Sequence, residues 1–339
     1  MSLSTDNEPL AVKQCANMHC LVYIILVFSL AFCTSGTKFI VATGFTERNG
    51  FIKETEIIDL DNPHSKCLPW ANSLLGVQSA VGGIINEGLL ICAGSSFMGD
   101  SKQCQLITPV LAEETVSLNY ASFDSSGVVL NEDRLFVIGG VNFALDGELN
   151  RTEFVSTNYS TLGPTLPQDL LYQYCAHKID EKTVMVIGRN NSYFYSIKDD
   201  QWNEGPHFSK PRSVHACGSF RLGNRVFSIA AGGDYVDDDE ILDSSLVEIF
   251  AHDDGNEESQ WIAGPRLPYP IDFGFKRQIV FNEKELFFID GYTNVFLKLV
   301  CDSTEVTSCH WEALEHKLEI PRLGAVMALI PEELAVCTT

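Results

Sequence analysis

The sequence predicts an all-β protein built from a repeated unit, and three observations support this prediction. First, six short apolar runs end in glycine at positions 44, 94, 140, 188, 233 and 291, with intervals of 50, 46, 48, 45 and 58 residues. Second, each run is followed by one of mostly alternating polarity, which is typical of a β-strand. Third, no stretch between them has the periodicity of an amphipathic helix. Repeats of this length are typical of propellers, solenoids and arrays.

The glycine-ended runs are the first elements to assign. They are rich in Val, Ile, Leu and Phe and too short for helices, so we expect strands that are buried on both faces. They occupy residues 39–44, 89–94, 135–140, 183–188, 226–233 and 286–291. The alternating strands that follow them occupy residues 55–60, 102–107, 152–157, 192–197, 245–250 and 294–299.

A bulky residue, usually tryptophan, marks an outer strand after each alternating strand except that of the second unit. These residues are Trp70, Leu162, Trp202, Trp261 and Trp311. Three of the outer strands lead into Gly-Pro, at 163–164, 205–206 and 264–265. Proline ends a strand because its φ is fixed and it has no N–H to donate.

A further strand precedes each glycine-ended run from the second unit onward. We place these inner strands at residues 79–85, 125–130, 175–180, 215–220 and 276–281. Each unit then contains four antiparallel strands in the order inner, glycine-ended, alternating and tryptophan-bearing. Four-stranded units that repeat around an axis are the blades of a β-propeller, an architecture that leaves only short strand edges exposed.

The two ends of the strand sequence predict the number of blades. The first unit begins on a glycine-ended strand, and an inner strand at 324–329 follows the last unit. If this strand completes the first blade, the ring closes with six blades. Residues 334–337 are a further candidate strand, but a seventh blade would lack its outer strands, so we expect six.

These residues resemble the kelch repeat, in which a hydrophobic strand ends in Gly-Gly, an aromatic or apolar strand follows, and a tryptophan lies downstream. The resemblance spans residues 37–339. It is strongest at 135–140 and 226–233, where both glycines are present, and the other four sites retain one of them. It implies a propeller that presents loops for binding, on a fold that carries both enzymes and interaction modules.

The N-terminal residues 1–36 are predicted to form a signal peptide. Residues 20–33 are an uncharged apolar run of 14 residues, followed by small residues at 34–36. A membrane-spanning helix needs about 20 residues, so the length suits a signal peptide better. Initiation at either Met1 or Met18 is compatible with this interpretation. The alternative is an uncleaved signal anchor, which would attach the protein to a membrane.

The cysteines also favour an oxidising compartment. Three of the 11 cysteines (Cys15, Cys20 and Cys33) lie in the leader, and an even number of eight remains. Eight cysteines allow 105 pairings, but the register of the repeats places some of them close together, on neighbouring strands or around a short turn. The predicted disulfides are Cys175–Cys217, Cys301–Cys309, Cys92–Cys104 and, from the two that remain, Cys67–Cys337.

Three sequons, at Asn150, Asn158 and Asn190, predict N-glycosylation in the same compartment.

The net charge of −22 disfavours binding to nucleic acids and to anionic membranes, and no basic stripe is present. The acidic runs at 237–240 and 252–258 are interpreted as solvated loops, because their spacing matches no calcium-binding loop.

The sequence contains no nucleophile elbow, P-loop, zinc-protease or dinucleotide-binding motif. His177 and His215 lie on inner strands near Tyr174, but two histidines are too few for a metal site, so we expect them to be structural and we expect no cofactor. The sequence therefore favours a secreted module that binds an extracellular protein or glycan. The alternatives are an extracellular enzyme at the channel mouth, with galactose-oxidase-like architecture, and an intracellular kelch adaptor.

Overall fold

The computed structural model describes residues 37–338 except 143–146, 149, 168–173, 210, 234, 238–239, 243, 253–259, 270–277, 283–284 and 292. The predicted signal peptide lies outside the described residues, as do residues 253–258 of the second acidic run and residues 238–239 of the first. Across the described part of the chain, no helix is long and apolar enough to cross a bilayer.

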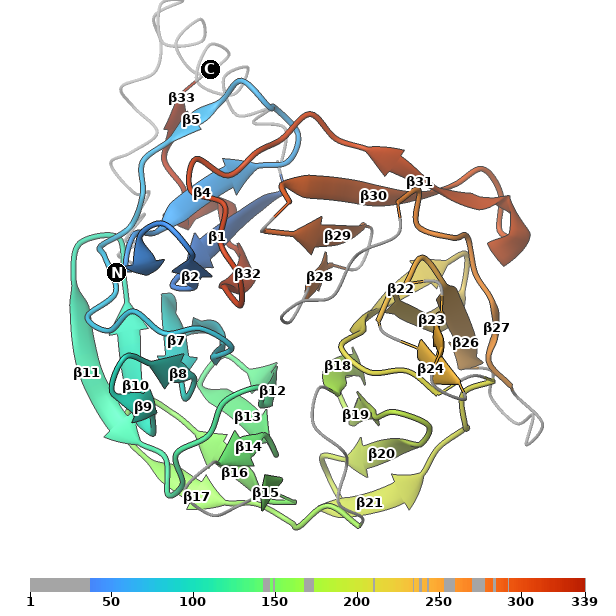
Figure 1. Cartoon of the computed structure of the whole chain (residues 1–339), viewed down its shortest axis with the longest axis horizontal. Coiled ribbons are helices and arrows are strands. Elements are labelled where there is room, and N and C mark those ends of the chain that lie inside the picture. The colour runs from blue at the N-terminus through green and yellow to red at the C-terminus, as the bar shows by residue number, and fades with distance from the viewer. Residues whose placement is uncertain are drawn as a thin grey trace, which may run out of the picture. The chain divides into compact units, whose positions relative to one another are not determined.

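Most of the described strands form six antiparallel sheets of three or four strands arranged in a ring, which confirms the prediction of a six-bladed β-propeller (Figure 1). From the channel outwards, blade two contains β6 (Val81–Ile85), β7 (Gly88–Cys92), β10 (Gln103–Ile107) and β11 (Ala112–Ser117). Blade three contains β12 (Ser126–Asn131), β13 (Arg134–Ile138), β16 (Thr152–Val155) and β17 (Ser160–Leu162). Blade four contains β18 (Cys175–Asp180), β19 (Thr183–Ile187), β20 (Ser192–Ser196) and β21 (Gln201–Glu204).

Blades five and six follow the same order. Blade five contains β22 (Ala216–Leu222), β23 (Arg225–Ala231), β26 (Val247–His252) and β27 (Ile262–Ala263). Blade six contains β28 (Gln278–Phe281), β29 (Leu286–Asp290), β30 (Val295–Cys301) and β31 (Cys309–Ala313).

Blade one is built from both ends of the described chain. Its inner strand β32 (Val326–Ile330) pairs antiparallel with β1 (Lys38–Ala42), which in turn pairs with β4 (Glu56–Asp59). The register runs from Lys38 opposite Ile330 to Ala42 opposite Val326. The C-terminal strand therefore closes the ring, as the strand order predicted.

The outer edge of blade one differs from the expected pattern. A short ladder of β5 (Lys66–Cys67) and β33 (Cys337–Thr338) lies outside β4, so the chain after β32 adds to blade one and starts no seventh blade. Trp70 follows β5 without belonging to a strand, because Pro69 has no N–H to continue the ladder. Its indole nitrogen instead donates to the Leu334 carbonyl at 3.1 Å.

The glycine-ended strands form the core of the ring. Every residue of β1 and β7 is buried, because neighbouring blades cover both faces of each sheet. The tryptophans of the later blades link each blade to the one before it. Their indole nitrogens donate to the carbonyls of the Gly-Pro prolines, Trp202 to Pro164 (3.4 Å), Trp261 to Pro206 (3.3 Å) and Trp311 to Pro265 (2.8 Å).

Four disulfides cross-link the ring. They join the cysteines as predicted, in the pairs Cys67–Cys337, Cys92–Cys104, Cys175–Cys217 and Cys301–Cys309. Four disulfides in one chain are typical of a protein that folds in an oxidising environment.

Candidate functional site

Small hairpins project from one face of the ring. Each lies between the glycine-ended strand and the next strand of its blade, so these hairpins share a face, which we call the hairpin face. Among the described residues they are β2–β3 (Phe45–Thr46, Gly50–Phe51), β8–β9 (Ser95–Ser96, Gly99–Asp100), β14–β15 (Val141–Asn142, Gly147–Glu148) and β24–β25 (Tyr235–Asp237, Glu240–Leu242).

Backbone hydrogen bonds hold three of these hairpins against the segment that leads into the inner strand of the same blade. Each contact is a reciprocal pair of N–H to carbonyl bonds with distances of 2.8 to 3.0 Å. The paired residues are Phe45 with Leu323, Ser95 with Gln78, and Val141 with Phe123. The hairpins are therefore fixed projections of the ring.

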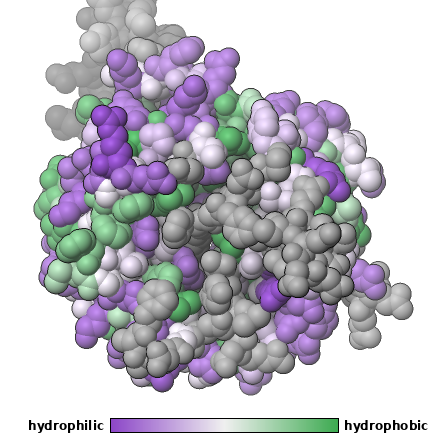
Figure 2. All heavy atoms as spheres, viewed as in Figure 1, coloured by the Kyte–Doolittle hydropathy of each residue, from purple (hydrophilic) through white to green (hydrophobic). Residues whose placement is uncertain are grey.

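The tip of β8–β9 is apolar and fully displayed to solvent. Phe97 and Met98 form its two-residue turn, and each is 92% exposed. The Ser96 hydroxyl accepts a hydrogen bond from the Met98 N–H at 3.1 Å and donates to the Gly99 carbonyl at 3.2 Å, which shapes the turn. Hydrophobic atoms also gather on the side of the ring where blades one and two lie (Figure 2).

The hairpin of blade one makes a direct comparison. The β2–β3 turn consists of Glu47, Arg48 and Asn49, all polar and exposed. The Thr46 hydroxyl accepts a hydrogen bond from the Asn49 N–H at 2.9 Å, so this turn is also ordered from within. The two neighbouring hairpins are attached to the ring by the same kind of backbone hydrogen bonds, but the tip of one is apolar and the tip of the other is polar.

A buried Glu or Gln on the third strand of four blades fixes the segment that crosses from the preceding blade. Gln105 accepts from the Leu74 N–H at 2.7 Å, and Glu153 accepts from the Asn119 N–H at 2.9 Å. Glu248 and Glu56 do the same and each also accepts a hydrogen bond from a buried arginine. These pairs are Glu248 with Arg212 and Glu56 with Arg322.

These three carboxylates and one amide were not predicted from the sequence. Their position in the repeat could have identified them. Each lies on the third strand of its blade, directly opposite the residue three places before the terminal glycine of the second strand. The opposed residues are Glu56 and Val41, Gln105 and Ile91, Glu153 and Val137, and Glu248 and Ala230.

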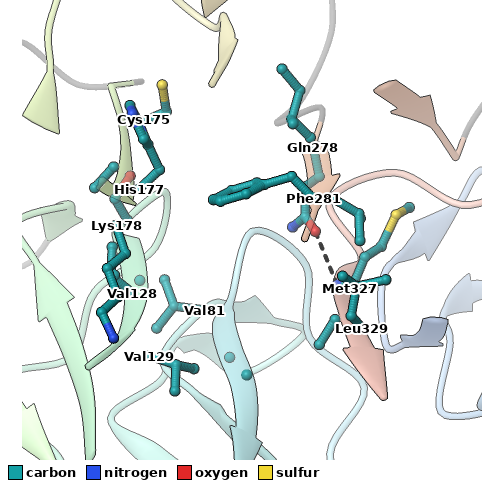
Figure 3. Close-up of a pocket in the computed structure, with 18 of the residues that line it drawn as sticks. Val81, Val128, Val129, Cys175, His177, Lys178, Gln278, Phe281, Met327 and Leu329 are labelled. Atoms are coloured by element: carbon teal, nitrogen blue, oxygen red, sulfur yellow. Dashed lines mark hydrogen bonds between the residues drawn. The ribbon is translucent and has the colours of Figure 1, made fainter. Parts of the chain in front are cut away.

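The inner strands of all six blades surround a central channel with a cavity of about 390 Å³ (Figure 3). Most of its lining is apolar, and Phe281 reaches from β28 across the channel to His177, with ring centroids 6.3 Å apart. Two polar lining residues are engaged by the protein itself. Gln278 bonds the Ala325 carbonyl and the Met327 N–H, and Lys178 bonds the Leu130 carbonyl and Glu181.

The two histidines singled out from the sequence have separate surroundings. His177 lines the cavity, and burial lowers its pKa to about 3. His215 lies just before β22, outside the cavity lining, where it packs edge-on against Phe208. Burial and, second, the nearby Arg212 charge lower the pKa of His215 to about 3. Both are therefore neutral at pH 7.

The hydroxyl of Tyr174 is engaged with the backbone of blade three. Its hydroxyl donates to the Ile138 carbonyl at 3.0 Å and accepts from the Gly140 N–H at 2.6 Å. Tyr174 thus holds the glycine turn of blade three. In the described part of the chain, no group of three or more His, Cys, Asp or Glu side chains is placed to hold a metal.

The three sequons lie in loops. Asn158 and Asn190 are exposed in the turns after β16 and β19, and Asn150 is half-buried just before β16. The backbone carbonyl of Asn150 accepts a hydrogen bond from Leu166, while the carbonyl of Asn190 accepts one from Phe208. Whether they carry glycans remains a prediction.

No protein-family model matches the chain, and no curated protein is significantly similar to it in sequence. Six-bladed rings serve both as binding scaffolds and as enzymes, so the fold alone does not select between them.

Proposed function

We propose that this chain is a secreted, kelch-like β-propeller that binds an extracellular protein through its hairpin face. The observation that carries the proposal is the Phe97–Met98 turn. Two large apolar side chains are 92% exposed at the tip of a hairpin whose base is tied to the ring by backbone hydrogen bonds. Exposure of this kind costs solubility unless a partner covers it, which supports a recognition role.

The chemistry of the turn favours a protein over a glycan as the ligand. Aromatic residues and methionine are enriched at protein interfaces, where a few well-packed side chains supply most of the binding energy. Methionine also adapts to irregular apolar pockets because its side chain is unbranched and polarisable. The partner is expected to offer an apolar pocket that receives Phe97 and Met98.

The charge of the chain constrains the rim of that pocket. A net charge of −22 gives long-range attraction to a basic partner surface and repulsion from anionic lipid. Insertion of the Phe97–Met98 turn into a membrane is therefore disfavoured. We expect basic residues around the partner's pocket and an association rate that falls as salt is added.

Secretion is supported by three independent features. The apolar run at 20–33 has the length of a signal-peptide core, eight cysteines form four disulfides, and three sequons are present. Expressed in a secretory host, the chain is expected in the medium, shortened near Gly36 and sensitive to N-glycosidase. A cytosolic, full-length and unglycosylated product would contradict secretion.

The enzyme alternative finds less support in the side chains. A copper oxidase of the galactose-oxidase kind needs a cysteine linked to a tyrosine, whereas all eight cysteines outside the leader are paired with one another. We therefore propose that the chain has no catalytic activity of the oxidase class. Stoichiometric copper together with a Cys–Tyr adduct in the purified protein would overturn this part of the proposal.

The binding proposal is tested by screening the protein purified from the medium against arrays of extracellular proteins and of glycans. Every hit is then measured with Phe97→Ser/Met98→Ser and with the matched control Glu47→Ser/Arg48→Ser. Protein hits should lose about 30-fold or more in affinity with the first variant and stay within about threefold with the second. Hits confined to glycans, or protein hits that ignore both variants, would overturn the proposal.

A further inference from the structure

A continuous chain of hydrogen-bonding groups joins the Cys175–Cys217 disulfide to the end of strand β26. His177 Nδ1 lies 3.4 Å from the Cys217 Sγ atom, and His177 Nε2 lies 2.6 Å from the Ser228 hydroxyl. The same hydroxyl lies 2.7 Å from His252 Nε2. His177 and Ser228 are buried, whereas His252 is half-buried.

The disulfide at the end of this series of hydrogen bonds borders the central channel. Both Cys175 and Cys217 line the cavity, and their bond joins the inner strands of blades four and five. The other disulfides have no atom in the cavity lining. They join strands within blade two, strands within blade six, and the two ends of the described chain.

The hydrogen-bond donors of this series of groups can all be oriented towards the sulfur of Cys217. If His252 donates from Nε2 to the Ser228 oxygen, the Ser228 hydroxyl donates to His177 Nε2. The remaining proton of neutral His177 then sits on Nδ1, facing the Cys217 sulfur. Burial and, after it, the nearby His252 and His215 of blade five lower the pKa of His177 to about 3, which fits this neutral form.

We propose that Cys175–Cys217 is a thiol–disulfide exchange site for small thiols that enter the channel, with His177 as the proton donor to Cys217. A cavity of about 390 Å³ lies at the lower end of the range for small-molecule sites, roughly 300–1,000 Å³. It admits a small thiol, while a folded thiol protein is too large for the channel.

The exchange balances without any other reactant. The thiolate of the small thiol attacks the Cys175 sulfur and forms a mixed disulfide, and the electrons of the broken bond pass to Cys217. Cys217 takes the Nδ1 proton of His177, which regains a proton at Nε2 from Ser228, and Ser228 regains one from His252. The half-buried His252 regains its proton from solvent, which received the proton of the small thiol when that thiol ionised. A second small thiolate attacks the mixed disulfide, which releases Cys175 and leaves the two small thiols oxidised to a disulfide.

The test measures the opening of each disulfide in the full chain with reduced glutathione as the small thiol. Samples are quenched with acid and alkylated, and mass spectrometry reports every cysteine separately. The variants are Ser228→Ala and His252→Phe, which interrupt the series of hydrogen bonds at different points. The control is His310→Gln, since His310 adjoins Cys309 in a different disulfide.

We expect glutathione to open Cys175–Cys217 in the unaltered protein. Ser228→Ala and His252→Phe should each slow that opening by about 10-fold or more, within the range of general acid catalysis. The other three disulfides provide internal references and should open at unchanged rates, and His310→Gln should leave Cys175–Cys217 unaffected. Because His252 is half-buried at a strand end, its variant tests the idea even if Ser228→Ala disturbs packing.

Two results would overturn the proposal. One is that Cys175–Cys217 stays closed under glutathione while Cys301–Cys309, of which only Cys301 is half-buried and Cys309 is buried, opens. The other is that it opens at the same rate in the unaltered protein and in both chain-breaking variants. Neither result bears on protein binding by the hairpin face, so the two proposals fail separately.

Discussion

The guanidinium of Arg322 donates a hydrogen bond to the carboxylate of Glu56, which lies 266 residues earlier in the chain. Glu56 also accepts hydrogen bonds from the backbone N–H groups of Glu319 and Ile320. The pair therefore fastens blade one to the segment that leads into the closing strand β32. Cys67–Cys337 fastens the same blade beyond the other end of β32, so the ring is closed at both of its faces.

We predict that Arg322→Leu destabilises the ring strongly. The Arg322 side chain is fully buried, and its loss leaves the Glu56 carboxylate buried without its cation. Breaking a buried pair from one side costs about 3–5 kcal/mol. Urea unfolding followed by intrinsic fluorescence measures the change. The control Glu181→Gln breaks the ion pair with Lys178 at the surface and should lower the free energy of unfolding by less than about 1 kcal/mol. Equal losses of stability in the two variants would contradict the closure role of Arg322.

The disulfide Cys67–Cys337 should contribute more stability than the disulfide of blade six. It spans 270 residues, against 8 for Cys301–Cys309. On the chain-entropy account these loops correspond to about 5.5 and about 2.5 kcal/mol. Cys67→Ser/Cys337→Ser should therefore lower the melting temperature more than Cys301→Ser/Cys309→Ser while leaving a folded ring. The reverse order of melting temperatures would show that loop length does not govern these bonds.

Close packing of the inner strands predicts the effect of a single methyl group. A Cβ atom at Gly83 would overlap the Val129 side chain of the neighbouring blade. Gly83→Ala should destabilise the protein by about 1–3 kcal/mol, and adding Val129→Ala should restore part of the loss. Gly147→Ala is the control, because nothing lies within 4 Å of a Cβ there. Thermal melting of the three variants checks the order, and a neutral Gly83→Ala would contradict it.

The buried histidines predict that stability falls on mild acidification. Burial lowers the pKa of His177 and of His215 from 6.5 to about 3, so the unfolded chain binds more protons below pH 6.5. Their contribution is complete above about pH 6.5 and is lost as the pH falls towards 3. Between pH 7 and pH 5 the loss is about 2 kcal/mol for each histidine.

Urea unfolding at pH 7 and pH 5 measures this dependence. His177→Gln and His215→Phe should each flatten it by about 2 kcal/mol. His310→Gln serves as the control, since His310 is about half exposed. An unaltered slope in both buried variants would show that these histidines are protonated in the folded ring.

The blades and their closure could be predicted because burial on both faces restricts the glycine-ended strands to apolar residues. The repeat register that follows also brings Cys175 near Cys217, and Cys92 near Cys104. Such pairs depend only on strand order and face, which the repeat fixes.

The hairpin face could not be predicted from periodicity. Its strands are two or three residues long, too short to show an alternating pattern. The available signal for the tip was the placement of Phe97 and Met98 between serines and Gly99, where a turn of small residues is expected. The buried role of Glu56 could not be predicted either. A glutamate in an alternating strand is expected to face solvent, and its partner Arg322 is distant in the sequence.

The most direct test of the central claim is site-specific photo-crosslinking from the hairpin face. A photoreactive amino acid replaces Met98 in one variant of the full chain and Arg48 in the other, and each secreted protein is irradiated with the extracellular protein found by the array screen. The account predicts a covalent complex from position 98 and at most a trace from position 48, with the yield at 98 falling as salt is added. Equal yields from both positions, or a partner that binds and never crosslinks at 98, would contradict it.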